Sequence, residues 1–351
     1  MTRQTANVYS LLHALESFFD SLPENLVSAA QLELVKNAAD FFPPLLRLAL
    51  ECRLNSHQQV DLQLCIRRDE DDLRSIFKWV KKNFTTTDYE QEKIVAFFRN
   101  WANKSSSYYK NIIEVFLELD VLPSGNRIPL LFFALEPGLS AIEVKNHFSP
   151  ILRQTLGDRT FLNLFETVAD SCPDNAFVAY LGLLFSRDID VLRVNIKKLS
   201  AADVIPFLQK IGYTWISPAL EDWITFIYSY ADRVTVCIDI GKNIFPKIGF
   251  ECFWNEQPAM ETKWMLFMDE LIRRNLCRLD KVDTVLAWDN EIFPSQISTW
   301  PPHLWIQSLS KPENQFTVLR KKLSHIKLSY CTGQAPEVKA YLGYGNIWLT
   351  A

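Results

Sequence analysis

The residues that could do chemistry are cations, carboxylates and aromatic rings that alternate with apolar residues in short segments. The cations of this pattern are Arg47, Arg53, Arg193, Lys247, Lys327 and Lys339, with Tyr341 and Asn195 as neutral donors. Cations that converge in a partly apolar cavity suit a multiply charged anion such as a diphosphate, because charge-assisted hydrogen bonds to phosphate oxygens are strong. The diphosphate site that we predict comprises Arg53, Arg193, Lys247, Lys327, Lys339 and Tyr341.

The same segments carry isolated carboxylates and phenyl rings. The carboxylates are Glu51, Glu136 and Glu251. One of them could hold or deprotonate a nucleophilic second substrate, so these are the predicted catalytic residues. The rings are Phe116, Phe132 and Phe253. They could shield a carbocation between two substrates, and packing in a core is the competing explanation for each ring.

These residues lie on five predicted β-hairpins, each of which follows a predicted pair of helices. The last hairpin, from Ser324 to Tyr344, shows the pattern clearly, because Lys339 and Tyr341 alternate with apolar residues and a turn at Gly333 separates its two runs. Alternation with a period of two is the signature of a strand with one apolar face. The five units span about 1–68, 69–137, 138–198, 199–256 and 257–351, and a proline- and tryptophan-rich loop, Phe293 to Pro312, precedes the last hairpin.

The predicted fold is a single α+β domain in which five helix-helix-strand-strand repeats close into a ten-stranded antiparallel barrel surrounded by helices. Closure removes unpaired sheet edges, and ten strands enclose a lumen wide enough for a small ligand. The helices then cover the apolar outer face, and the polar faces line the lumen. Two alternatives are an open sheet whose polar face meets water and a helical bundle or two-domain α+β protein.

Composition narrows the possible partners. The net charge of −4 is spread along the chain without a large basic block, which argues against nucleic acid or an anionic membrane. The N-terminus lacks a signal-peptide core and no apolar run is long enough to span a bilayer, so a cytoplasmic protein is expected. Seven scattered cysteines fit reduced thiols better than disulfides or a zinc site.

Metal and histidine chemistry find little support in the sequence. The acidic run from Asp69 to Asp72 is similar to an aspartate-rich metal motif, but acidic residues are also favoured at the first turn of a helix, which we prefer. We therefore predict no metal site. The five histidines are scattered without ligand spacing, so we expect surface or loop positions, with His325 beside the last hairpin as a possible proton shuttle.

The order of elements and the tripeptide Lys339-Ala-Tyr341 resemble the aromatic prenyltransferases of the ABBA type, in which Lys-x-Tyr pairs bind diphosphate. Three further tripeptides at comparable strand positions keep the cation without the tyrosine: Lys247-Ile-Gly249, Lys327-Leu-Ser329 and Arg193-Val-Asn195. The resemblance implies transfer of an allylic group from an isoprenoid diphosphate to an aromatic or peptide acceptor in natural-product biosynthesis.

By the same resemblance, a cage of cations replaces magnesium, so no cofactor is required, although magnesium stays possible. We expect a monomer or homodimer. The alternative function is a non-catalytic barrel that binds a peptide or partner protein in a biosynthetic pathway, for which the many tryptophans would supply an interface.

Overall fold

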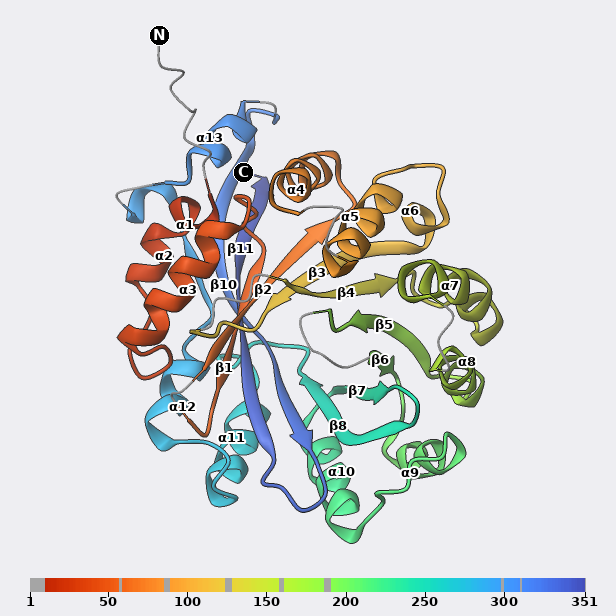
Figure 1. Ribbon diagram of the computed structural model, residues 1–351. Helices are drawn as coiled ribbons and strands as arrows, with labels where there is room; N and C mark the ends of the chain where they lie inside the picture. Colours follow the sequence, from red (N-terminus) through yellow and green to blue (C-terminus); the bar gives the residue numbers. More distant parts are fainter. Residues whose placement is uncertain are drawn as a thin grey trace.

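The computed structural model describes residues 10–56, 59–84, 89–123, 128–157, 161–185, 191–297, 300–309 and 311–350. Five units of helices and strands follow one another around a central barrel, and the helices form its outer layer (Figure 1). The predicted barrel surrounded by helices is confirmed.

The bounds of the elements follow chain order. The first unit contains α1 (Leu11–Ala14), α2 (Glu16–Asp20), α3 (Ala29–Phe41), β1 (Leu48–Arg53) and β2 (Val60–Arg67). The second contains α4 (Glu70–Asn83), α5 (Tyr89–Trp101), α6 (Ser107–Asn111), β3 (Ile112–Leu119) and β4 (Leu130–Leu135). The third contains α7 (Ala141–Leu156), α8 (Phe161–Ser171), β5 (Phe177–Leu183) and β6 (Leu192–Lys197).

The fourth unit contains α9 (Ala201–Lys210), α10 (Pro218–Tyr230), β7 (Arg233–Ile240) and β8 (Ile244–Phe253). The fifth contains α11 (Lys263–Arg273), α12 (Leu279–Leu286), β9 (Asn290–Ile292), the 3-10 helix η1 (Pro294–Gln296), α13 (Pro302–Ser308), β10 (Gln315–Tyr330) and β11 (Glu337–Thr350).

The barrel closes because its last strand pairs with its first. All neighbouring strands are antiparallel, in the order β1 to β8, then β10 and β11, and β11 returns to β1 with Glu51 opposite Tyr341. The short strand β9 pairs only with β10, outside the ring. An open sheet and a helical bundle are therefore both wrong.

Apolar residues on the outer face of the barrel form the main core. Examples with no exposed surface, one from each unit, are Leu50, Leu117, Val194, Phe250 and Ile326. Burying such side chains beneath the helices removes apolar surface from water, worth about 25 cal/mol per Å². A second, smaller cluster lies inside the barrel and includes Leu130 and Phe132. The alternation of each strand thus separates an apolar outside from a mixed inside.

Two elements differ from the sequence prediction. The last hairpin is longer than Ser324 to Tyr344, because β10 and β11 continue beyond the barrel to Gln315 and Thr350. A β-bulge between Leu323 and His325 shifts the alternation there, which hides the continuation in the sequence. The expected loop from Phe293 to Pro312 contains the helix α13. Its first helical residue is Pro302, and proline is favoured at the first position of a helix.

The acidic run after β2 starts a helix, as expected. The side chain of Asp69 accepts a hydrogen bond from the backbone N–H of Asp72 at 2.9 Å and so caps α4. Both aspartates also form ion pairs with Arg47. The hydrogen bond gives a free backbone N–H at the start of α4 a partner, and the ion pairs connect this end of the helix to Arg47, the residue before β1. In the described part of the chain, no helix combines the length and the apolar character that crossing a bilayer requires.

Candidate functional site

Three cavities follow one another along the barrel lumen. The deep cavity, of about 40 Å³, lies near the hairpin turns and is bordered by Lys247 and Glu337. The middle cavity has a volume of about 150 Å³ and shares Glu118, Lys327 and Tyr341 with the deep one. The outer cavity, of about 300 Å³, lies under the extension of β10 and β11. The lumen is therefore narrow and charged at one end and wider at the other.

Alternation on the strands brings cations to the deep cavity. Its cationic lining consists of Arg193 from β6, Lys247 from β8, Lys327 from β10 and Lys339 from β11. Lys327 and Lys339 lie directly opposite each other on paired strands. Gly249 leaves room beside them, since a Cβ there would lie 3.3 Å from Lys327 Cε. The four cations thus surround one small space.

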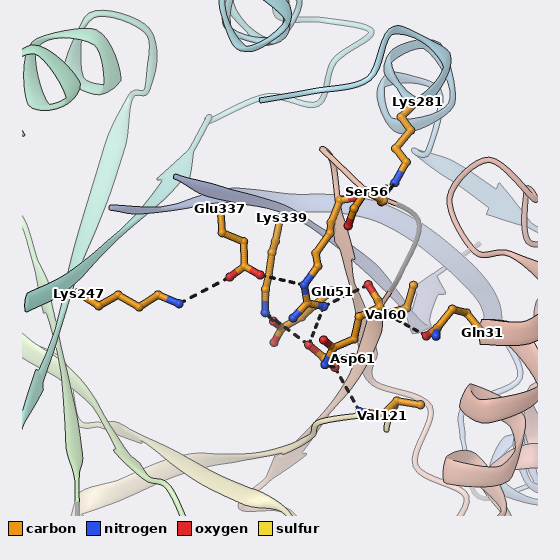
Figure 2. Close-up of polar contacts among 12 residues, drawn as sticks. Gln31, Glu51, Ser56, Val60, Asp61, Val121, Lys247, Lys281, Glu337 and Lys339 are labelled. Carbon is orange, nitrogen blue, oxygen red and sulfur yellow. Dashed lines mark hydrogen bonds and ion pairs between the residues drawn. The ribbon is translucent and has the colours of Figure 1, made fainter. Parts of the chain in front are cut away.

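Each of these cations is paired with a carboxylate. Lys339 Nζ lies 3.1 Å from Glu51 and 3.4 Å from Asp61, and Lys327 Nζ lies 3.1 Å from Glu251. The remaining pairs are Arg193 with Asp239, at 2.6 Å, and Lys247 with Glu337, at 3.7 Å. Figure 2 shows Glu51, Asp61, Glu337 and Lys339 close together, with Lys247 reaching toward Glu337.

Arg53 lies behind this layer and not on the cavity wall. Its guanidinium bonds Glu337 at 2.8 Å and Asp61 at 3.1 Å, so it holds two carboxylates that also contact Lys247 and Lys339. Five cations therefore face five carboxylates: Arg53, Arg193, Lys247, Lys327 and Lys339 against Glu51, Asp61, Asp239, Glu251 and Glu337. The layer has no large net charge.

Two buried glutamates next to each other have opposite pKa shifts. Burial alone would raise the pKa of Glu51, but Lys339 and Lys327, with a hydrogen bond from Tyr341, lower it to about 2. Burial and the nearby Glu51 charge raise the pKa of Glu118 to about 8. Like charges in one site push their pKa values apart in this way. At neutral pH, Glu118 is therefore a buried proton carrier beside an ionised Glu51.

The middle cavity is lined by rings on several sides. Phe116, Phe132 and Phe253 all border it, together with Tyr180 and Tyr341. The His325 ring is stacked on Tyr341 with a centroid distance of 4.0 Å and lies 4.6 Å from Phe253. Such faces carry negative partial charge and stabilise a cation held against them. The cavity can thus hold a planar or cationic group.

Glu251 faces the middle cavity from β8. Its Oε1 accepts bonds from Lys327 at 3.1 Å, the Cys237 thiol at 3.4 Å and Asn195 Nδ2 at 3.5 Å. Burial raises its pKa, but the charge of Lys327 and the hydrogen bonds from Lys327 and Cys237 outweigh burial, so the pKa lies below its usual value. Glu251 is therefore ionised at neutral pH.

The structure brings most predicted site residues together. Phe116, Phe132 and Phe253 share the middle cavity, and Tyr341 lines the deep one with every cation of the predicted diphosphate site except Arg53. Arg47, which the sequence pattern also placed in the lumen, lines the outer cavity instead. Glu136 does not join them, and its predicted place in the lumen is wrong. It follows the last residue of β4, where Pro137 ends the strand, and it is exposed. The chemical roles of the other residues stay predictions.

Several lumen residues were missing from the predicted site. These are Asp61, Glu118, Tyr180, Asp239 and Glu337. Their alternation places them on the inner faces, which is the signal that could have found them, but pairing across strands cannot be read from one strand. His325, expected beside the hairpin, is buried within the lumen.

The acidic side chains of the lumen face cations. Among the described residues, no group of three histidine, cysteine, aspartate or glutamate side chains is placed to hold a metal ion. The carboxylates of the deep cavity are bonded to cations instead. We therefore assign no step to magnesium.

A ring of ten antiparallel strands with pairs of helices outside it is the PT barrel, the fold of the ABBA aromatic prenyltransferases. Two solved structures match nearly the whole chain. They are the apo form of prenyltransferase PriB (12% identity, 95% of this chain and 96% of that one, TM-score 0.53) and 5-dimethylallyltryptophan synthase from Streptomyces coelicolor (12%, 96% and 98%, TM-score 0.53). No family model and no curated protein matches the sequence.

A third structure is similar over a smaller share. AnaPT from Neosartorya fischeri is 13% identical over 84% of this chain and 77% of its own length, with a TM-score of 0.50. A ternary complex of PriB with L-tryptophan and dimethylallyl thiolodiphosphate matches at a TM-score of 0.53 and 14% identity. At these identities the likeness establishes the fold.

Proposed function

We propose that this chain is a prenyltransferase that moves an allylic group from an isoprenoid diphosphate to an aromatic acceptor, free or within a peptide. The observation that carries the proposal is the contact between the two inner cavities. The cations of the deep cavity border the ring-lined middle cavity through Lys327 and Tyr341. The PriB ternary complex, which holds a tryptophan and a diphosphate analogue, supports the same pair of ligands.

The reaction would begin in the deep cavity. The carbon–oxygen bond of the allylic diphosphate breaks, and its electron pair leaves with the diphosphate. Lys247, Lys327, Lys339 and Arg193 stabilise the charge that develops on the leaving group, which is usually the largest catalytic contribution. The allylic cation that remains points toward the rings of the middle cavity, where Phe116 and Phe132 exclude water.

The acceptor would then attack the allylic carbon and lose one proton. An alkylated aromatic ring with an extra proton is a strong acid, so even an ionised carboxylate with a low pKa can accept that proton. Glu251 is the carboxylate on the wall of the middle cavity, and its Oε1 accepts the hydrogen bonds from Lys327, Cys237 and Asn195. We assign proton acceptance to its second oxygen, Oε2.

Binding of the diphosphate requires the ion-paired layer to change. The cations are already neutralised by carboxylates, and the deep cavity has room for little more than one or two waters. A diphosphate must therefore displace carboxylates such as Glu51 from the cations, and a displaced Glu51 gains a proton because its low pKa depends on those cations. Uptake of protons is thus part of the proposed binding step.

The same neutral layer is the observation that favours the alternative function, a non-catalytic barrel that binds a peptide or partner protein. Five matched ion pairs are a stable end state if no anion ever enters. In that case the lumen would be a structural core with a polar interior, and the outer cavity would be the part that meets a partner.

A single experiment separates the two functions. The protein is incubated with dimethylallyl or geranyl diphosphate and with tryptophan, tyrosine and peptides that contain them, and products are read by mass spectrometry. Enzyme activity predicts an acceptor heavier by one allylic group and release of diphosphate. Heat stabilisation by the diphosphates without any product would support binding alone. The proposal would be overturned if no product forms and no diphosphate stabilises the protein against heat.

A further inference from the structure

The cations at the mouth of the barrel, the end of the lumen beyond the middle cavity, are not all paired with carboxylates. Arg47 and Arg67, which line the outer cavity, have carboxylate partners. Lys197 on β6, Arg233 on β7 and Lys322 on β10 form no ion pair in the part of the chain that the structure describes. We infer that these three residues, the cationic rim, bind a peptide segment with acidic side chains. The inference rests on the proposed function in one respect, because it makes acidic peptides the class of acceptor.

Alternation along the strands places the cationic rim at the mouth. On β6, Arg193 lines the deep cavity and Asn195 lines the middle one, so Lys197 lies two residues further out on the same face. On β7, Arg233 is directly opposite Phe253, which borders the middle cavity. Both cations therefore lie where a ligand would enter the lumen, outside the two inner cavities.

Neutral groups hold two cations of the rim, which leaves their charge uncompensated. Lys197 Nζ donates a hydrogen bond to the Tyr180 hydroxyl at 2.9 Å. The Arg233 guanidinium lies over the Phe253 ring, 5.7 Å from its centroid. In the deep cavity, by contrast, every cation is matched by a carboxylate. Uncompensated positive charge at an opening attracts anionic partners and selects against cationic ones.

The third cation of the rim, Lys322, is exposed and shares the outer cavity with Arg320. Arg320 Nε lies 3.8 Å from Asp289 and 4.0 Å from Glu291, which is too far for a hydrogen bond. This nitrogen is buried and has no hydrogen-bond partner. A buried donor without a partner is costly, and an acceptor on a ligand removes that cost. The outer cavity therefore suits a carboxylate side chain.

The spread of the cationic rim favours an extended peptide over a small anion. The strands β6, β7, β8 and β10 are neighbours in the ring, so the rim covers three strand spacings. At about 4.8 Å per spacing the rim is about 14 Å long, and about four or five residues of an extended peptide at about 3.3 Å each cover this length. A diphosphate is too short to reach all three cations at once. Recognition of acidic motifs by clustered cations is a recurring mode of peptide binding.

The test measures the binding of two fluorescent peptides by anisotropy, without any diphosphate. One peptide is Asp-Gly-Asp-Gly-Asp, and the other is its neutral counterpart Asn-Gly-Asn-Gly-Asn. We expect the wild type to prefer the acidic peptide by about tenfold at low salt, and the preference should shrink as salt screens the exposed charges. The double variant Arg233→Gln with Lys322→Gln should lose the preference, and its melting temperature shows that it folds. The matched control is Lys242→Gln, an exposed lysine at the opposite end of β7, which should keep the preference.

Equal affinity of the wild type for the two peptides, or an unchanged preference in the double variant, would overturn the inference. A preference lost in Lys247→Ala would also overturn it, because the peptide would then bind in the deep cavity. So would tighter binding of a single-stranded oligonucleotide of equal charge, which the net charge of −4 disfavours. Because the measurement needs neither diphosphate nor turnover, it separates this inference from the proposed function. Binding of the acidic peptide by a protein that makes no product would retain the rim site and remove only the transferase activity.

Discussion

The ammonium group of Lys339 lies 3.1 Å from the carboxylate of Glu51, and the two residues are 288 positions apart in the chain. Lys339 also reaches Asp61 at 3.4 Å, and neither carboxylate is exposed by more than 1%. A buried cation is thus shared by two buried anions. Removing it leaves Glu51 in a low-dielectric space without its ion-pair partner, whereas Asp61 keeps only its pair with Arg53.

Lys339→Ala should therefore lower the free energy of unfolding by about 3–5 kcal/mol, as expected when one partner of a buried pair is removed. Denaturant unfolding followed by circular dichroism measures this change. Lys263→Ala, which breaks an exposed pair with Asp232, is the matched control and should change the free energy of unfolding far less, because water screens an exposed pair. A loss for Lys339→Ala no larger than that of the control would contradict the buried network.

Lys247→Ala should weaken diphosphate binding without a comparable loss of stability. The Lys247 side chain is 49% exposed, and its ammonium lies 3.7 Å from Glu337, which Arg53 also holds. Its loss leaves no buried carboxylate unpaired. Calorimetric titration with inorganic diphosphate should show weaker binding by about tenfold, as for one lost charge-assisted bond, with Lys263→Ala unchanged. Equal affinity of the wild type and Lys247→Ala would place the anion elsewhere.

Gly249→Ala tests the same cavity without changing any charge. A Cβ at this position would lie 3.2 Å from Cys237 Cβ and 3.3 Å from Lys327 Cε, so it narrows the space between the cations. We expect diphosphate binding to weaken while stability changes little, because the contacted atoms belong to side chains. The expected result is a lower affinity in titration at an unchanged melting temperature. Unchanged affinity would mean that the diphosphate does not enter the deep cavity.

Diphosphate binding should take up protons at pH 8–9. Glu118, with a pKa of about 8 in the free protein, is largely ionised at pH 9, and a nearby diphosphate raises its pKa further. Affinity should therefore increase as the pH falls from 9 to 7, with uptake of about one proton near pH 9. Titrations in buffers of different ionisation enthalpy measure this uptake. Glu118→Gln should reduce it, and an unchanged uptake would assign it to the other carboxylates.

Glu118 should also make stability fall with rising pH. Its folded pKa of about 8 lies above the value of 4.5 for the unfolded chain, so the folded state binds the extra proton. The contribution is fully present below the unfolded pKa and is lost as the pH rises through 8. The pKa of Glu51 is lowered to about 2, so ionisation of Glu51 changes the pH dependence of stability only below pH 4.5.

Unfolding free energies measured at pH 5, 7 and 9 should therefore decline less in Glu118→Gln than in the wild type. Glu114→Gln, a half-buried carboxyl on the same strand, is the matched control and should keep the decline of the wild type. An equal decline in the wild type and Glu118→Gln would show that Glu118 is ionised in the folded protein.

Alternation along single strands accounts for the part of the site that the sequence predicts. A period of two places Lys339 and Tyr341 on the same face, and a closed barrel turns every such face inward. Register between strands is set by the geometry of closure, so the contact of Lys327 with Glu251 and the carboxylate partners of the other cations could not be predicted. Glu136 fails for a local reason, because alternation does not show where a strand ends.

The pairing of β11 with β1 also sets an order of events during synthesis. The ribosome releases Glu337–Thr350 after the other strands of the ring, so the ring stays open until β11 has been synthesised. Contacts between strands far apart in the sequence are slow to form, because the entropy of bringing them together is lost first. Until then the nascent polypeptide carries two unpaired β edges, and we expect a chaperone to cover them against pairing with other chains.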